Sequence, residues 1–240
     1  MALQVIYKPK GKALEYSSYA VNPYIGCDCG CKYCFAPGVA RKTRDEYLNV
    51  RARDNYLKKL EHDCKELKGL EERVLLSFMT DPYNSLEQEM RLTRSTLEMF
   101  NEYNIPFQVL TKRGGYASED FNLYRECDAF ASTLTFTNGA LSKEWEPGAQ
   151  SHFTRVTALE KAHDMKINTW VSLEPIIDSA EAIKIINQTY KFVDLYKVGK
   201  LNHSKDNQIS NIDVENIINL LNRYGKKYIV KEDTKKLLVK

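Results

Sequence analysis

The chain has 240 residues, of which 43% are hydrophobic and 28% charged, a composition that excludes wholesale disorder and allows a packed core. The net charge of +3, from 35 basic and 32 acidic residues, excludes strong long-range attraction for nucleic acid over the whole surface. No apolar run approaches the roughly 20 residues of a membrane helix and no secretory signal is recognisable, so we expect one cytoplasmic domain over residues 1–240, with a core at about 19–225 and a short basic tail at 226–240.

Short apolar runs alternate with helical patterns along the chain. A strand near residues 19–25 comes first, and a long excursion over 35–68 with one helix near 54–67 follows it. The later runs read as buried strands at 73–81, 106–112, 129–136, 168–175 and 195–202.

Amphipathic helices are predicted between these strands. Ser85 with Gln88 forms a capping-box pattern that begins one helix, and Ser179 is suited to cap a second. A third apolar pattern starts at Val214 and ends before Gly225, a residue typical of the position just beyond a helix. Each of these helices is expected to turn one face toward a core.

Strict alternation of strand and helix predicts parallel strands joined by right-handed crossovers. Six such units are too few to close an eight-stranded barrel, so the pattern favours an α/β fold with a partial (β/α)6 TIM-like barrel; a doubly wound sheet is the alternative. In either fold, chemistry gathers at the carboxyl ends of the strands. We therefore expect the loop at 27–34, residues 80–83, Lys112, Glu174 and the stretch after Gly199 around one mouth.

The clearest chemical motif is a cluster of cysteines, which should be reduced thiols in a chain with no export signal. Cys27, Cys31 and Cys34 have the spacing C-x3-C-x2-C, with Tyr33 directly before the last cysteine. Three thiolates would leave one iron of a [4Fe-4S] cluster open to an external ligand. The alternative is a structural zinc ion that Cys29 could complete, although alternate residues in a tight loop seldom converge on one ion and no histidine lies nearby.

The spacing C-x3-C-x-aromatic-C after a first strand resembles the signature of the radical S-adenosylmethionine (SAM) superfamily. Segments between residue 21 and about 202 resemble, in order, its spore photoproduct lyase-like branch: NPYIGCDCGCKYCFA, SFMTDPY, VLTKR, EPGAQSHFTRVTAL and WVSLEPI. The resemblance implies a partial (β/α)6 barrel in which SAM chelates the open iron of a [4Fe-4S] cluster and is reductively cleaved to methionine and a 5′-deoxyadenosyl radical. It also implies an external electron donor such as flavodoxin or ferredoxin. The substrate stays unidentified, with a nucleic acid base as one candidate.

Several polar residues are candidates for binding SAM. Lys112 shares a strand face with Leu110 and Gln108, so it should point into the barrel, and by resemblance it contacts the SAM carboxylate; a solvated lysine is the alternative. By resemblance, Ser132 offers a hydroxyl to SAM and Arg155 lies near the SAM site. The alternatives are a locally bonded strand serine and a surface charge, respectively.

Other candidates come from the ends of the second and fifth predicted strands. Thr80 and Asp81 stand where many radical SAM enzymes carry Gly-Gly-Glu to hold the SAM amino group; TDPY departs from that pattern and could do similar work or form an ordinary turn. Glu174 alternates with apolar neighbours and should face the barrel as a contact to SAM or substrate. Tyr33, which directly precedes Cys34 in the cysteine loop, is a further candidate contact to the cofactor. Met79 aligns with the cysteine from which spore photoproduct lyase returns a hydrogen atom, and it has no S–H bond to give.

A competing interpretation is a zinc-stabilised module that binds RNA or DNA without radical chemistry. Its basic surface would be the C-terminal tail, which contains Lys226, Lys227, Lys231, Lys235, Lys236 and Lys240. An electron carrier is a poorer interpretation, because three cysteines and an open iron suit that role badly. Cys64 and Cys127 are expected to be structural and far from the cysteine loop.

Overall fold

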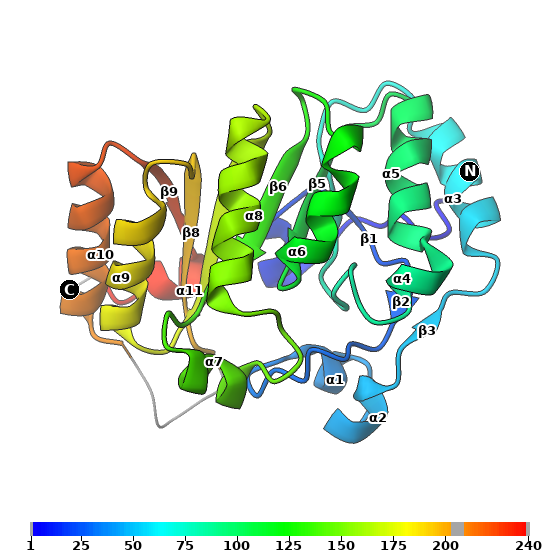
Figure 1. Ribbon diagram of the computed structural model, residues 1–240. Helices are drawn as coiled ribbons and strands as arrows, with labels where there is room; N and C mark the ends of the chain where they lie inside the picture. The colour runs from blue at the N-terminus through cyan, green and yellow to red at the C-terminus, as the bar shows by residue number, and fades with distance from the viewer. Residues whose placement is uncertain (1, 203–208, 239–240) are drawn as a thin grey trace.

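The computed structural model describes residues 2–202 and 209–238, which form a parallel sheet with helices on its outer face (Figure 1). The seven strands of this sheet lie in the order β1-β4-β5-β6-β7-β8-β9, and every neighbouring pair is parallel. Their bounds are Tyr19–Val21, Val74–Leu76, Phe107–Thr111, Ala129–Thr133, Asn168–Ile176, Leu195–Lys200 and Lys227–Val230. Within the described residues no pairing joins β1 to β9, so the fold is the open, partial TIM-like barrel that was predicted.

Helices connect the successive strands and cover the outside of the sheet (Figure 1). The longer ones are α3 (Tyr56–Glu66), α5 (Leu92–Glu102), α8 (His152–Asp164), α9 (Ser179–Thr189) and α10 (Asn211–Arg223). The shorter ones are α1 (Ala36–Val39), α2 (Arg44–Leu48), α4 (Glu87–Met90), α6 (Gly114–Ala117), α7 (Gly139–Trp145) and α11 (Glu232–Lys235), with 3-10 turns at Gly11–Glu15 and Ser118–Leu123. A separate antiparallel pair, β2 (Tyr24–Ile25) and β3 (Arg51–Ala52), flanks the sheet.

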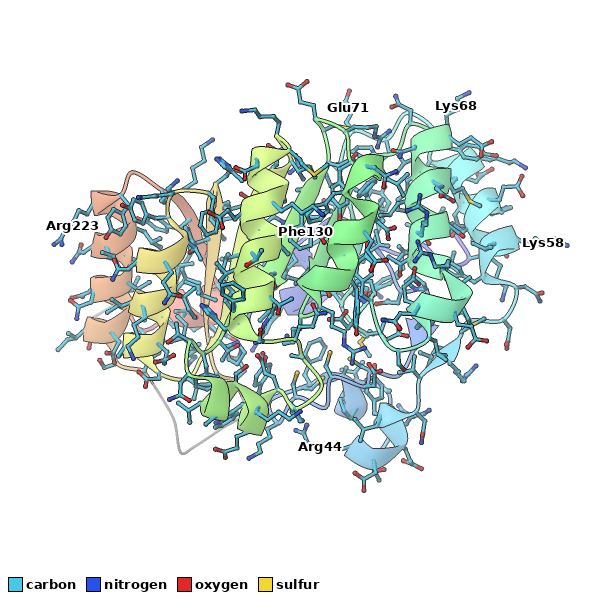
Figure 2. All side chains as sticks on the ribbon, viewed as in Figure 1. Arg44, Lys58, Lys68, Glu71, Phe130 and Arg223 are labelled. Atoms are coloured by element: carbon cyan, nitrogen blue, oxygen red, sulfur yellow. The ribbon has the colours of Figure 1, made fainter. Side chains whose placement is uncertain are left out.

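Side chains alternate between the two faces of the sheet, because successive residues of a strand point to opposite sides. The outward residues form the main apolar core with the helices; Phe130, labelled in Figure 2 beneath α8, is one of them. The inward residues form a smaller cluster that includes Ala129, Ala131 and Trp170.

The N-terminal residues form an arm that enters the open side of the barrel. The fully buried carboxylate of Asp63 accepts hydrogen bonds from the backbone N–H groups of residues 4–6, which fixes the start of the arm. Tyr7 then pairs with Ala20 of β1. Farther along, the ring of Tyr16 packs against Trp170 inside the barrel, with ring centroids 5.9 Å apart.

The strand predictions were right in type and order but wrong in number and in several bounds; the strand predicted at 129–136, for example, ends at Thr133. The predicted strand at 19–25 is split between β1 and β2, because Pro23 lacks the N–H group that a continuing ladder needs. The predicted strand at 73–81 ends at Leu76, after which the N–H groups of Phe78 and Met79 donate to the side chain of Asn22. The tail at 226–240 is not a free basic segment: it supplies β9, a seventh strand, and α11.

Two predicted helix caps were also wrong. Ser85 donates its backbone N–H to Asp28, and the helix begins at Glu87 and is interrupted at Arg91, where φ is 53°. Asp178, not Ser179, caps α9. The helix predicted at 54–67 is confirmed as α3, and α10 ends before Gly225, whose φ of 63° is the left-handed conformation expected there. None of the helices in residues 2–202 and 209–238 is long and apolar enough to cross a membrane.

Candidate functional site

A cavity of about 930 Å³ opens at the carboxyl ends of the strands, the end of the molecule where α1 and α7 lie in Figure 1. Parallel barrels commonly carry their chemistry at this end. Arg44, at the bottom of Figure 2, is on its rim. Most of the residues singled out from the sequence line this cavity: Cys27, Cys31, Tyr33, Cys34, Thr80, Asp81, Lys112 and Glu174. Ser132 and Arg155 are not among the lining residues.

The cysteine loop between β2 and α1 is held in place by close backbone contacts. A Cβ atom on Gly26, where φ is 85°, would lie 2.4 Å from the carbonyl oxygen of Asn49, so glycine is required there. A Cβ atom on Gly148 would lie 2.1 Å from the carbonyl oxygen of Asp28. The Gly148 N–H donates to the carbonyl of Cys29 at 2.9 Å. The segment around Gly148 therefore packs directly on the loop and limits its conformations.

The four thiols of the loop all line the cavity, and the six cysteines of the chain are all free. A hydrogen bond from the Cys29 thiol lowers the pKa of Cys27 and raises that of Cys29, while burial raises the pKa of Cys31 to about 12. Ligand atoms of Cys27, Asp28 and Cys29 lie within 4.8 Å of one another, a group that does not include Cys31 or Cys34. The three predicted ligands thus face one cavity without converging on a single point.

A buried carboxylate that sequence reasoning missed, Glu146, joins the loop to two of the predicted cations. With 1% exposure, it accepts a hydrogen bond from the Tyr33 hydroxyl and another at 2.8 Å from Nη1 of Arg155. The Lys112 Nζ lies 3.9 Å from it. Burial acts to raise the pKa of Glu146, but the charges of Arg155 and Lys112 outweigh burial and hold that pKa below its usual value. Glu146 is therefore an anion that positions three of the side chains around it.

The positions of Arg155 and Ser132 differ from those expected. Arg155 is fully buried behind Glu146, so the alternative of a surface charge is wrong, and the guanidinium does not reach the cavity. Ser132 is also fully buried, and its hydroxyl donates to the carbonyl of Thr111 at 2.9 Å, which is the locally bonded alternative. The next residue, Thr133, lines the cavity instead, because neighbours on a strand face opposite sides.

Asp81 lines the cavity and also orders the neighbouring strand end. One carboxylate oxygen accepts hydrogen bonds from the Thr111 hydroxyl at 2.7 Å and the Tyr83 N–H at 3.0 Å. The other accepts the backbone N–H of Lys112 at 2.8 Å. Burial acts to lower the pKa of Lys112, but the carboxylate of Glu146 and, at high pH, the thiolate of Cys31 outweigh it and raise that pKa, so the lysine is a cation. Asp81 therefore fixes the backbone of Lys112, and Glu146 fixes its ammonium group.

A second wall of the cavity is built around Glu174 and the N-terminal arm. The Tyr16 hydroxyl donates to Glu174 and lies 3.1 Å from the Ser172 hydroxyl. A Cβ atom on Gly199 would lie 2.7 Å from the Glu174 carboxyl carbon, so only glycine leaves room for this carboxylate. Lys231, which follows β9, lies 3.7 Å above the Tyr16 ring.

Beneath this wall, Lys197 is buried inside the barrel. Its ammonium lies 4.1 Å above the ring of Trp170 and donates a 3.1 Å hydrogen bond to the carbonyl of Tyr16. Burial, helped by the nearby charge of Lys231, lowers the pKa of Lys197 to about 7. Tyr16 and Lys231 were missed because the arm and β9 carry no recognisable motif. Lys197 lies in β8, a strand that was predicted, but no motif marked it as a site residue.

Comparisons with other proteins relate the chain to two uncharacterized proteins. No family model matches it. It is 27% identical over 191 residues to an uncharacterized protein of Methanocaldococcus jannaschii, covering 78% of this chain and 71% of that protein. It is 25% identical over 184 residues to an uncharacterized protein of Mycobacterium tuberculosis, covering 70% of this chain and 52% of that protein.

Solved structures show the same fold at low sequence identity. A spore photoproduct lyase mutant with bound S-adenosylmethionine and dinucleoside spore photoproduct matches with a TM-score of 0.65 and 14% identity, covering 94% of this chain and 64% of that one. A radical SAM methyltransferase from Sphaerobacter thermophilus matches with a TM-score of 0.64 and 13% identity, covering 88% and 65%. Streptococcus suis SuiB bound to S-adenosylmethionine matches with a TM-score of 0.64 and 12% identity, covering 88% and 49%. The chain thus spans about half to two thirds of these proteins, and it shares their fold.

Proposed function

We propose that this chain is a radical SAM enzyme, in which Cys27, Cys31 and Cys34 hold a [4Fe-4S] cluster and SAM binds in the adjoining cavity. The observation that carries the proposal is that three free thiols with this spacing face one cavity at the carboxyl ends of a radical SAM fold. At about 930 Å³, the cavity is large enough for SAM and part of a substrate.

The positions of the thiols favour a cluster over a single zinc ion. Thiolates on one tetrahedral zinc, with Zn–S bonds of about 2.3 Å, lie roughly 4 Å apart. Cys31 and Cys34 stay outside the group of ligand atoms within 4.8 Å that contains Cys27. Ligands on different irons of a cluster are farther apart than ligands of one zinc ion, so three thiols that do not all lie within 4.8 Å of one another are compatible with a cluster.

When bound, the cluster would supply the electron that cleaves SAM into methionine and a 5′-deoxyadenosyl radical. Lys112 binds the SAM carboxylate as a cation, and Glu146 and Asp81 keep it in place. Tyr33, Thr80 and the carboxylate of Asp81 offer further polar contacts on the cavity wall. Glu174 forms one wall of the cavity together with Tyr16, and we place the substrate against this wall. The walls hold the reactants in position and exclude water.

The substrate we propose to test first is a nucleic acid base, since one structure with the same fold has a dinucleoside photoproduct bound. Met79 lines the cavity, as expected, and presents a thioether there. The reaction is therefore proposed to differ from spore photoproduct repair. An external donor such as flavodoxin or ferredoxin supplies electrons, in the cytoplasm, where cysteines stay reduced.

The competing zinc module is distinguished by metal content. Protein purified without oxygen and analysed for iron, sulfide and zinc should be brown and contain iron and sulfide in equal amounts. Colourless protein with one zinc ion per chain would replace the enzyme proposal with the zinc module. The burial of Lys231 already counts against a fully exposed basic tail as a nucleic-acid-binding surface.

A further inference from the structure

The ammonium group of Lys231 is buried in the cavity wall, and its two carboxylate neighbours lie at the outer limit of an ion pair. The residue is 3% exposed and lines the cavity. Its nearest carboxylate oxygens, on Glu15 and Glu174, are 3.8 Å and 4.0 Å away, which is beyond hydrogen-bonding distance. Among residues 2–202 and 209–238, its Nζ donates one hydrogen bond, to the carbonyl of Lys12 at 3.3 Å. A lysine ammonium has three N–H donors, so most of its capacity is unused.

The two carboxylates nearest to Lys231 already accept hydrogen bonds from other groups. Glu174 accepts the hydroxyl of Tyr16, and Glu15 accepts the backbone N–H of Glu232 at 3.0 Å. The Tyr16 ring, 3.7 Å below the ammonium, compensates the charge in part. Burial lowers the pKa of Lys231. The loss of hydration therefore destabilises the charged form of this lysine by more than the neighbouring carboxylates stabilise it.

The surrounding wall is also basic. Lys12 and Lys200 line the same cavity as Lys231. The Lys12 ammonium pairs with Asp233 and donates a 3.2 Å hydrogen bond to the side-chain oxygen of Asn202. Apart from Asp81 and Glu174, the charged residues among the described lining are all lysine or arginine. Buried cations are normally paired with an anion, and a lysine is a common partner of phosphate.

We infer that Lys231, with Lys12 and Lys200, binds an oxyanion group of the substrate, a phosphate or a carboxylate, in the part of the cavity that the N-terminal arm and β9 enclose. The inference rests on the proposed function, because it takes this cavity as the reacting one. Beyond that function, it assigns an anionic group to the substrate and names the residues that would bind this group. An ion pair between Lys12 of the N-terminal arm and Asp233 joins the arm to α11.

The test uses the cluster-reconstituted protein with SAM, kept without oxygen, and measures binding by calorimetry. The probes are uridine 5′-monophosphate for phosphate, glutarate for carboxylate, and uridine as the uncharged control. At least one anionic probe should bind, and Lys231→Met should weaken it about tenfold or more. The matched control Lys227→Met, on the exposed side of β9, should leave the affinity unchanged. Equal affinity in both variants, or no binding of either anion, overturns the inference.

A second measurement needs no variant and therefore holds even if Lys231→Met fails to fold. Wild-type protein is acetylated briefly with acetic anhydride, and each lysine is followed by mass spectrometry. The bound anion should slow acetylation of Lys231 and not of Lys227. Equal rates at Lys231 with and without the anion overturn the inference. Release of 5′-deoxyadenosine from the same samples reports on the proposed function separately.

Discussion

The guanidinium of Arg155 donates a 2.8 Å hydrogen bond to the carboxylate of Glu146, and neither side chain is exposed to solvent. This buried pair lies between the cysteine loop, through Tyr33, and the end of β5, through Lys112. A charge in such a place is stable only while its partner remains. The pair therefore links the stability of the protein to the geometry of its site.

Replacing Glu146 with Gln should lower the free energy of unfolding by about 3 kcal/mol, because Arg155 and Lys112 lose their anion. The measurement is denaturant unfolding of the apo protein. Glu144→Gln is the matched control: Glu144 forms an exposed pair with Lys32, and its loss should cost less than about 1 kcal/mol. Equal losses in the two variants would show that the buried pair has no special role.

Replacing Lys112 with Ala should weaken SAM binding roughly tenfold to a hundredfold while the cluster stays intact, because a contact to a charged group is typically worth about 1.5 to 3 kcal/mol. SAM titration and iron analysis of the reconstituted protein measure the two quantities. Lys58→Ala, on the outer side of α3 (Figure 2), is the control. An unchanged SAM dissociation constant would return Lys112 to a role in packing alone.

Replacing Cys27, Cys31 or Cys34 with Ala should remove the cluster, whereas Cys29→Ala should retain it. Cys29 lines the same cavity and lies close to Cys27. The Cys29→Ala variant therefore tests whether the cluster ligands follow the sequence spacing and not mere proximity. Iron and sulfide content after reconstitution gives the answer. Loss of the cluster in Cys29→Ala to the same extent would show that the ligand set is wrong.

The stability contribution of Lys197 should depend on pH. Its folded-state pKa of about 7 lies below the ordinary value of 10.5, so between these values the unfolded chain holds a proton that the folded chain lacks. The free energy of unfolding due to this group therefore rises with pH across that window. Lys197→Met, which cannot titrate, should gain stability relative to wild type at pH 7 and lose that gain toward about pH 10. A difference between the two proteins that is constant with pH would contradict the burial of a titrating lysine.

The protein should not convert spore photoproduct efficiently to two thymines, because Met79 offers no S–H bond where a hydrogen donor would stand. The assay is anaerobic incubation with the dinucleotide lesion and chromatography of the released thymidine. Repeated clean turnover would restore the repair function to this chain.

Sequence reasoning found the sheet and most of the cavity because both follow from local patterns. Alternation of strand and helix predicted the open barrel, and residues directly after strand ends, such as Lys112, fell where parallel strands place them. Ser132 was chosen for its hydroxyl, but it does not line the cavity and its neighbour Thr133 does, because one residue along a strand moves a side chain to the opposite face.

What the sequence did not reveal depends on contacts between distant segments. Glu146 lies in a loop, and its role exists only because folding brings Arg155 and Lys112 to it. Lys231 was assigned to a tail because β9 is short and flanked by lysines, so its apolar pattern is weak. Tyr16 reaches the site through an arm whose course is set by Asp63, far along the chain.

The most direct test of radical SAM chemistry is the formation of 5′-deoxyadenosine. Anaerobically reconstituted protein is mixed with SAM and a strong reductant, and the products are separated by chromatography, with the Cys31→Ala variant as control. We expect 5′-deoxyadenosine and methionine in equal amounts from wild type and neither from the variant. Intact SAM in the presence of a fully loaded, reduced cluster would contradict it.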